Sequence, residues 1–211
     1  MAPGALDVPP SCGPTGSRGT IVHSVHARKI PNRKRAASPF SLPNRKRAAS
    51  PFSPAERAGD DYELWPQPQA DLGARLQSFF RDHCDGRAGG GAVAIGTDSP
   101  TLPRDFVERA FDLLERHDCV LGPATDGGYC LAGLRDSRLP IFEGIAWSGP
   151  RVLEQTIARL ERCGASLALL PPWYDVDAPA DLAFLRGHIR AMLRAGQTVD
   201  CPHTLPLLGI E

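Results

Sequence analysis

Residues 92–103 (AVAIGTDSPTLP) constrain the fold of this chain more than any other stretch. The small and apolar residues 92–95 predict a short buried strand, which Gly96 ends. The two prolines that follow prevent the strand from continuing, because each fixes φ and lacks a backbone N–H. Asp98 therefore lies at the carboxyl end of a predicted strand, where ligands bind in open α/β sheets. The Asp-Ser-Pro sequence is also good turn chemistry, so a plain capping role for Asp98 stays open at this point.

Hydrophobic periodicity on both sides of this stretch predicts alternating helices and strands. Apolar residues recur at helical spacing in four segments, residues 71–81, 103–117, 150–163 and 178–193. Short apolar runs predict further strands at residues 119–124, 128–134 and 166–170. Strands that alternate with helices favour an α/β layered fold, and the 211-residue chain is long enough for one such domain with a proper core.

Three of the predicted loops carry polar residues at strand ends, namely residues 96–100, 124–129 and 174–177. The third places Asp175 and Asp177 at positions i and i+2, which point to the same side of an extended segment. The two carboxylates could therefore share one cation or one ribose. Protein-bound Mg²⁺ takes oxygen ligands, usually one or two carboxylates plus phosphates and water. One aspartate from the first loop and one or two from the third suit a nucleotide-linked Mg²⁺.

Ordinary structural roles compete with this interpretation. The sequence DAPAD that begins at Asp177 also fits a helix N-terminus, with a capping aspartate and a proline in the first turn. That alternative leaves Asp175 unexplained. Gly127 and Gly128 fit a tight hairpin turn, and Asp126 before them suits turn chemistry as well as a substrate contact.

Charge divides the chain into two parts. Residues 1–57 contain ten basic and two acidic residues, a net charge of +8, whereas the remainder contains 14 arginines and 22 acids, a net charge of −8. The basic part is rich in Pro, Gly and Ser, and its segment 31–41 (PNRKRAASPFS) recurs unchanged at 43–53. Two polar copies are too few to stack into a repeat fold, so we expect a disordered tail over residues 1–59.

The basic clusters of the tail admit more than one role. Arg-Lys-Arg could attract nucleic acid or an anionic surface, and RKRAAS resembles a basic-residue-directed phosphorylation site. No aromatic residues are interleaved to stack on bases, which argues against nucleic-acid binding. A solvated tail without a specific partner is the simplest interpretation.

The rest of the sequence argues for a cytoplasmic protein without a membrane partner. No apolar run approaches the roughly 18–20 residues that cross a bilayer. The N-terminus lacks the charged and apolar regions of a secretory signal. The six cysteines show no Cys-x-x-Cys or Cys/His ligand spacing. We therefore expect reduced thiols rather than a structural zinc site.

Taken together, the loops resemble a bacterial family of glycosyltransferase-A-like proteins. Its members are often labelled arsenosugar-biosynthesis-type glycosyltransferases and are distantly similar to molybdenum-cofactor guanylyltransferases. The resemblance covers about residues 64–186. It rests on five segments: QADLGARL (69–76), IGTDSPTLP (95–103), VLGPATDGGYCLAGL (120–134), IAWS (145–148) and DVDAPADL (175–182).

The resemblance implies a three-layer α/β fold of the nucleotide-diphospho-sugar transferase type, with a mostly parallel sheet flanked by helices. It implies an activated nucleotide donor and a divalent cation, Mg²⁺ or Mn²⁺. Asp98 would be a metal-binding and catalytic acid, Asp175 or Asp177 would complete the metal site, and Asp126 would be a second catalytic residue. The implied substrate contacts are Thr97, Ser99, Gly127, Gly128, Tyr129 and Trp147.

Residues 1–60 depart from the family pattern, in which a first strand leads into a Gly- and Lys/Arg-containing loop that cradles the nucleotide phosphates. The glycine-rich segment 13–19 contains a proline and is a poor phosphate loop. We therefore expect an N-terminally truncated fold, with residues 60–200 as the transferase-like domain and 201–211 as a C-terminal tail. Three functions stay open: glycosyl transfer from a nucleotide-activated donor, nucleotidyl transfer on the same scaffold, and an inactive remnant.

Overall fold

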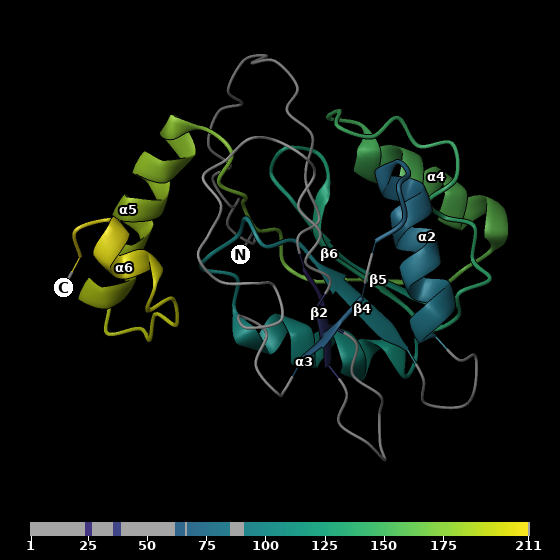
Figure 1. Cartoon of the computed structure of the whole chain (residues 1–211), viewed down its shortest axis with the longest axis horizontal. Coiled ribbons are helices and arrows are strands. Elements are labelled where there is room, and N and C mark those ends of the chain that lie inside the picture. Colours follow the sequence, from purple (N-terminus) through teal and green to yellow (C-terminus); the bar gives the residue numbers. More distant parts are fainter. Residues whose placement is uncertain (1–23, 27–35, 39–61, 66, 85–90, 211) are drawn as a thin grey trace, which may run out of the picture.

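The structure is a computed structural model that describes residues 24–26, 36–38, 62–65, 67–84 and 91–210. Its main sheet has five strands in the order β1-β4-β6-β5-β7 (Figure 1). Those strands are β1 (Ser24–His26), β4 (Ala92–Ile95), β5 (Cys119–Pro123), β6 (Tyr129–Leu134) and β7 (Leu167–Leu169). A separate parallel pair consists of β2 (Ala36–Ser38) and β3 (Tyr62–Leu64).

The main sheet is mixed, whereas a mostly parallel sheet was expected. β6 lies antiparallel between β4 and β5, with Leu134 opposite both Ala92 and Cys119. β1 is also antiparallel to β4, and only β5 and β7 pair in parallel. The direction of β6 follows from the short connection after β5. Residues 124–128 suffice for an antiparallel hairpin, whereas a parallel pairing needs a crossover of a dozen residues or more.

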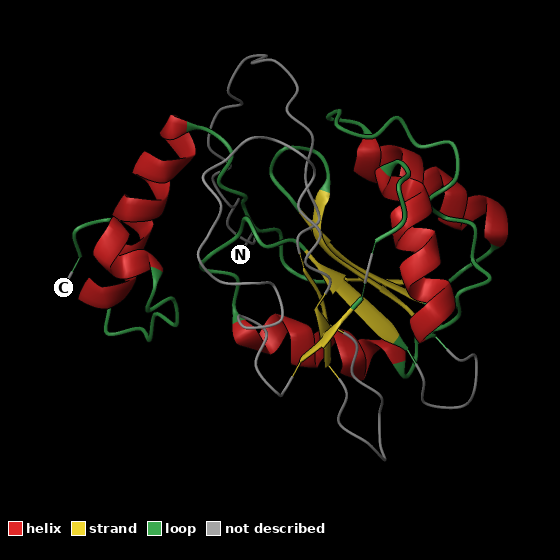
Figure 2. Ribbon diagram, in the orientation of Figure 1, coloured by secondary structure: helices red, strands yellow, loops and turns green. Residues whose placement is uncertain are grey.

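Helices cover both faces of this sheet (Figure 2). The described helices are α2 (Leu72–His83), α3 (Arg104–Leu114), α4 (Val152–Cys163), α5 (Pro179–Arg194) and α6 (Thr204–Leu207). Alternate strand residues face opposite ways: Ala94 and Leu121 pack in the core beside α2 and α4, while Val93 and Val120 pack in the core beside α3. The helix predicted at 71–81 begins as expected, because Asp71 caps it by accepting a hydrogen bond from Ala74 N at 2.8 Å.

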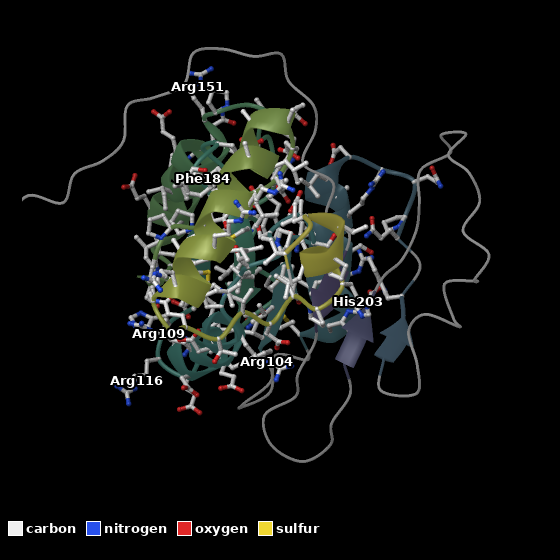
Figure 3. The ribbon with its side chains drawn as sticks, turned by 90° about the vertical axis from the view of Figure 1, so that its left-hand side faces the viewer. Arg104, Arg109, Arg116, Arg151, Phe184 and His203 are labelled. Carbon is white, nitrogen blue, oxygen red and sulfur yellow. The ribbon has the colours of Figure 1, made fainter. Side chains whose placement is uncertain are left out.

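The C-terminal helices α5 and α6 form a pair beside the sheet and its covering helices (Figure 1). They share a small core of their own, whose buried members are Leu185, Ile189, Cys201, Leu208 and Ile210. Residues 201–210, expected to be a tail, therefore supply part of a packed unit. Arg104, labelled in Figure 3, lies at the start of α3. It forms an ion pair with Asp200 at 3.4 Å.

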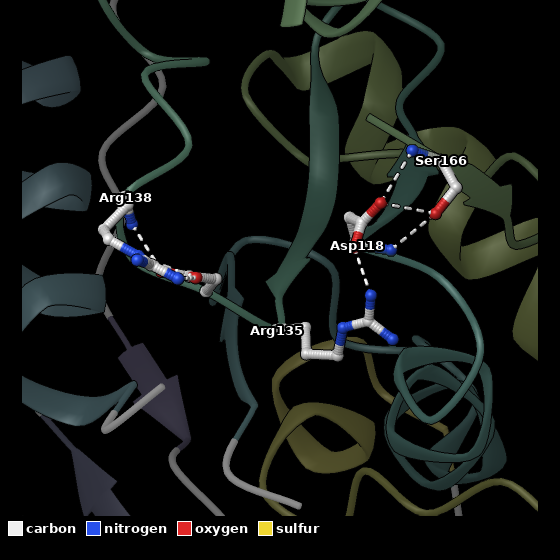
Figure 4. Close-up of polar contacts among 5 residues, drawn as sticks. Asp118, Arg135, Arg138 and Ser166 are labelled. Carbon is white, nitrogen blue, oxygen red and sulfur yellow. Dashed lines mark hydrogen bonds and ion pairs between the residues drawn. The ribbon is translucent and has the colours of Figure 1, made fainter. Parts of the chain in front are cut away.

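One end of the sheet is fastened by Asp118, which precedes β5 (Figure 4). Its carboxylate accepts hydrogen bonds from Ser166 Oγ at 2.7 Å and Ser166 N at 2.9 Å, and it pairs with the guanidinium of Arg135. These contacts, the Ser166 hydroxyl first, hold the pKa of Asp118 below its ordinary value. Asp118 thus joins β5, β6 and β7 at the amino ends of β5 and β7.

β1 and β2 lie within the segment 1–59 for which we predict disorder. The remainder of that segment, including both copies of the basic cluster, lies outside the described residues, so this prediction stays a prediction. Among the described residues, no helix is long and apolar enough to cross a membrane.

Candidate functional site

Three loops that leave β4, β5 and β7 meet at the opposite end of the sheet. The three strands run in the same direction, because β6 is antiparallel to both β4 and β5 while β7 is parallel to β5. Beyond β7 the chain continues beside the exit of β5, where Thr125 N donates to Trp173 O at 3.0 Å. Val176 N donates to the carbonyl of Asp98 at 2.9 Å, which ties the third loop to the first. The loops singled out in the sequence therefore come together in space.

Asp98 is the carboxylate with the most unusual environment in this group. Burial, followed by the negative charge of Asp175 and smaller effects of Asp177 and Asp126, raises the pKa of Asp98 to about 7. Its Oδ1 is buried and finds no hydrogen-bond partner among the described residues. A Cβ on Gly96 would lie 2.8 Å from that oxygen, so glycine makes room for the carboxylate. A buried, unpartnered carboxylate oxygen among like charges is an environment that a cation would relieve.

Asp175 is joined directly to the first loop. The buried hydroxyl of Ser99 donates to Asp175 Oδ1 at 2.6 Å. Burial raises the pKa of Asp175, the hydrogen bond from Ser99 opposes that rise, and Asp126 and Asp177 add to it. Ser99, for which a substrate contact is expected, holds a candidate metal ligand.

Asp126 shapes the turn between β5 and β6, which agrees with the turn role that the sequence leaves open for it. Its Oδ1 accepts a hydrogen bond from Gly128 N at 2.8 Å. Gly127 has a φ of +93°, and a Cβ there would lie 2.1 Å from the carbonyl oxygen of Pro150. Asp126 is nevertheless exposed, and its charge contributes to the raised pKa of Asp98 and of Asp175. A turn role and a place at the candidate site are both compatible with this geometry.

Asp177 does not cap α5. That helix begins after Ala178, and the carboxylate of Asp181 accepts hydrogen bonds from Ala178 N at 2.8 Å and Asp177 N at 3.1 Å. Partial desolvation, then the charges of Asp126 and Asp181, raise the pKa of Asp177. Because Asp181 carries out the capping, the side chain of Asp177 is available at the edge of the candidate site.

β6 presents Cys130 rather than Tyr129 to the aspartates. Tyr129 packs in the core beside α2, and burial raises its pKa. Cys130 lies in the core on the α3 side, where burial raises its pKa to about 12 and the charges of Asp175 and Asp98 contribute. The sequence analysis did not identify Cys130 as a site residue. Successive side chains of a strand point to opposite faces of the sheet, so Cys130 could have been placed on the face opposite to that of Tyr129.

Trp147 packs against α2, and no described contact joins it to the aspartates. Its indole approaches Gly73 so closely that a Cβ there would lie 2.6 Å from Nε1. Its ring meets Tyr129 edge to face, with centroids 6.3 Å apart. Thr97 lies on the exposed side of the first loop, next to Asp98. Of the expected substrate contacts, Thr97 is therefore open to solvent, whereas Tyr129 and Trp147 contribute to packing.

A second hydrogen-bonded link between these loops involves residues that the sequence analysis did not single out. Thr101 Oγ1 and the hydroxyl of Tyr174 lie 2.7 Å apart, and that hydroxyl lies 2.8 Å from Nδ1 of His188 on α5. His188 is far from Thr101 in sequence, and no local pattern predicts such a contact.

The donor groups at this edge are the oxygen ligands that Mg²⁺ and Mn²⁺ prefer. In the part of the chain that the structure describes, no three His, Cys, Asp or Glu side chains are grouped closely enough to hold an ion alone. Mg²⁺ typically takes only one or two protein carboxylates, with phosphate and water completing its shell. The unpartnered oxygen of Asp98 near Asp175 fits that pattern.

Comparison with known proteins identifies a matching family and a similar solved structure. The model of a family described as "Uncharacterized protein conserved in bacteria (DUF2064)" matches residues 35–149. The matched range contains the loops of Asp98 and Asp126 and ends before the loop of Asp175. No match was found among curated proteins.

The solved structure comes from Desulfovibrio desulfuricans G20 and is provisionally named a nucleotide-diphospho-sugar transferase. It is 32% identical to this chain, with a TM-score of 0.57. The match covers 64% of this chain and 57% of that protein, so this chain spans little more than half of its length.

Proposed function

The chain belongs to the DUF2064 family of bacterial proteins, and from that premise we propose that it transfers a sugar from a nucleotide-activated donor. In this proposal Asp98 and Asp175 hold a divalent cation, Mg²⁺ or Mn²⁺, with Asp177 at the edge of the site. The observation that carries the proposal is the buried, unpartnered Oδ1 of Asp98 at the carboxyl ends of β4, β5 and β7.

The similarity to the Desulfovibrio desulfuricans structure supports the class of donor. The geometry supports the cation, because Asp98 Oδ1 is buried without a hydrogen-bond partner among the described residues. Burial, followed by the charge of Asp175, raises the pKa of Asp98. Carboxylates alone would repel a nucleotide diphosphate, so a cation is needed between them and the phosphates. When bound, the cation would neutralise the charge of the departing diphosphate.

The protein's own side chains would position the cation and deprotonate the acceptor hydroxyl. The hydrogen bond from Ser99, the neighbour of Asp98 in the chain, holds Asp175 against the first loop. Asp126, exposed on the rigid turn before β6, would accept the proton of an acceptor hydroxyl. The acceptor oxygen then bonds to the anomeric carbon of the sugar, and the bond from that carbon to the diphosphate breaks. The nucleoside diphosphate leaves with the bonding electrons.

A donor-hydrolysis assay tests this function without knowledge of the acceptor, because water can replace it. Purified protein is incubated with UDP- and GDP-linked sugars with and without Mn²⁺, and release of nucleoside diphosphate is measured. Asp98→Asn should lower the Mn²⁺-dependent rate by at least ~100-fold, since even outer partners of metal ligands are worth about 10–100-fold.

Asp112→Asn is a matched control, because Asp112 is exposed on α3 and the substitution removes the same charge. It should leave the rate unchanged. Equal rates in Asp98→Asn and wild type would refute the proposed site. Release of pyrophosphate from nucleoside triphosphates, with no release from the sugar donors, would favour nucleotidyl transfer instead.

A further inference from the structure

We propose that Tyr174 is a positioning residue for the cation site, and that α5 holds it in place through His188. The inference rests on the proposed function, because it concerns the separation of Asp98 from Asp175. It assigns a role to the C-terminal helical pair, whose buried core residues follow the third loop in the chain.

The first observation is the burial of hydroxyl groups in the loop after β4. Only three polar residues among those described are buried: Ser99, Thr101 and Thr156. Ser99 and Thr101 both belong to this loop, and both hydroxyls bond to consecutive residues of the third loop. Burying a hydroxyl is unfavourable unless it is hydrogen-bonded, so the loss of either bond would destabilise the contact between the two loops.

The second observation is that both the hydroxyl and the ring of Tyr174 are held by neighbouring side chains. Its hydroxyl lies between Thr101 Oγ1 at 2.7 Å and His188 Nδ1 at 2.8 Å. Its ring stacks on Trp173 with centroids 5.6 Å apart and meets Phe184 edge to face at 4.8 Å. Both His188 and Phe184 belong to α5, so the helix fixes the tyrosine by hydrogen bonding and by packing.

The third observation connects this arrangement to the carboxylates. Tyr174 and Val176 both pack against the core of α5 and α6, and they flank Asp175 in sequence. Val176 N in turn donates to the carbonyl of Asp98. Movement of Tyr174 would therefore shift Asp175 relative to Asp98, and with it the spacing that a shared cation requires.

A simpler role for Tyr174 is to attach α5 to the rest of the protein. Figure 3 shows α5 crossing the near face of the molecule, with Phe184 projecting from it. An attachment role alone predicts that loss of the hydroxyl lowers the melting temperature and leaves cation affinity unchanged. A positioning role predicts that cation affinity falls as well.

Titration calorimetry with Mn²⁺ on the full chain, together with thermal melts, separates the two roles. Tyr174→Phe keeps the ring and removes the hydroxyl, and Thr101→Val removes the same hydrogen bond from the other side. Each should weaken Mn²⁺ binding about fivefold, as expected for one lost hydrogen bond. His188→Ala should do the same, whereas His188→Asn should retain most of the affinity, because its amide can occupy the place of Nδ1.

Leu76→Ala is the matched control. It opens the core beside α2, to which neither Tyr174 nor Val176 belongs, so it should lower the melting temperature and leave Mn²⁺ affinity unchanged. Unchanged affinity in folded Tyr174→Phe and Thr101→Val would overturn the positioning role and leave the cation site standing. An equal loss of affinity in Leu76→Ala would also overturn it. Failure of the wild-type protein to bind Mn²⁺ would overturn the cation site and the positioning role together.

Discussion

The hydroxyl of Ser99 donates a hydrogen bond of 2.6 Å to Asp175 Oδ1, and it thereby joins the loop after β4 to the loop after β7. The bond favours the ionised form of a carboxylate whose pKa is raised by burial. An ionised carboxylate is the form that binds a cation. Ser99 therefore prepares Asp175 as a ligand.

Ser99→Ala should weaken Mn²⁺ binding near neutral pH by roughly three- to tenfold, because the pKa of Asp175 rises and one loop contact is lost. Titration calorimetry measures the change. Ser166→Ala removes the same kind of hydroxyl–carboxylate bond at the other end of the sheet and should leave Mn²⁺ affinity as it is. A similar loss of affinity in both variants would show that the effect is general destabilisation.

The same Ser166→Ala variant tests the fastening at Asp118. Because the folded-state pKa of Asp118 is lowered, its contribution to stability is present above its ordinary pKa and is lost as the pH falls through the folded value. The variant should lose about 1 kcal/mol of unfolding free energy at neutral pH. Urea denaturation at about pH 7 and about pH 3 should show a smaller loss at the acidic pH. A loss that is independent of pH would contradict the role given to Asp118.

The raised pKa of Asp98 should make the free energy of unfolding depend on pH in the opposite direction. Its folded-state pKa of about 7 lies above the ordinary 3.8, so the folded protein holds a proton that the unfolded chain releases between those values. Without a cation, the free energy of unfolding should fall as the pH rises through this window. In the presence of a chelator, Asp98→Asn should exceed wild type in stability by on the order of 2 kcal/mol at about pH 8, and by little at about pH 4. An equal gain at both pH values would argue against the raised pKa.

Gly127→Ala should destabilise the protein by at least about 2 kcal/mol, because the backbone at +93° is strained for alanine and the new methyl group meets Pro150. Gly187 in α5 is a suitable comparison, since a Cβ there meets nothing within 4 Å. Gly187→Ala should raise stability by about 0.5–1 kcal/mol. Both values come from chemical denaturation, and similar effects of the two substitutions would be inconsistent with the turn geometry described above.

Much of the fold was predictable from local patterns. The helix at α2 follows from a capping aspartate and apolar residues at helical spacing, and the strand β4 from an apolar run that ends at glycine. The prediction of a mostly parallel sheet was wrong because it took the resemblance as a guide to strand direction. The connection of residues 124–128 was itself enough to indicate an antiparallel hairpin.

The candidate site was predictable only where a residue follows a strand. Asp98 and Asp175 belong to that class, and parallel strand ends bring them to one edge. Thr101, Tyr174 and His188 meet through contacts between distant segments, which no periodicity encodes. The sequence correctly indicated the start of α5 near Asp177. The capping carboxylate is that of Asp181 in the first turn, so the side chain of Asp177 does not cap the helix.

The effect of Mn²⁺ on thermal stability tests the central claim most directly. A cation that binds only the folded protein raises its melting temperature, and it should also relieve the repulsion among the aspartates. Wild type and Asp112→Asn should both gain stability from Mn²⁺, more so when UDP or GDP is added, while Asp98→Asn should gain little. An equal gain in Asp98→Asn and wild type would contradict a cation site at Asp98.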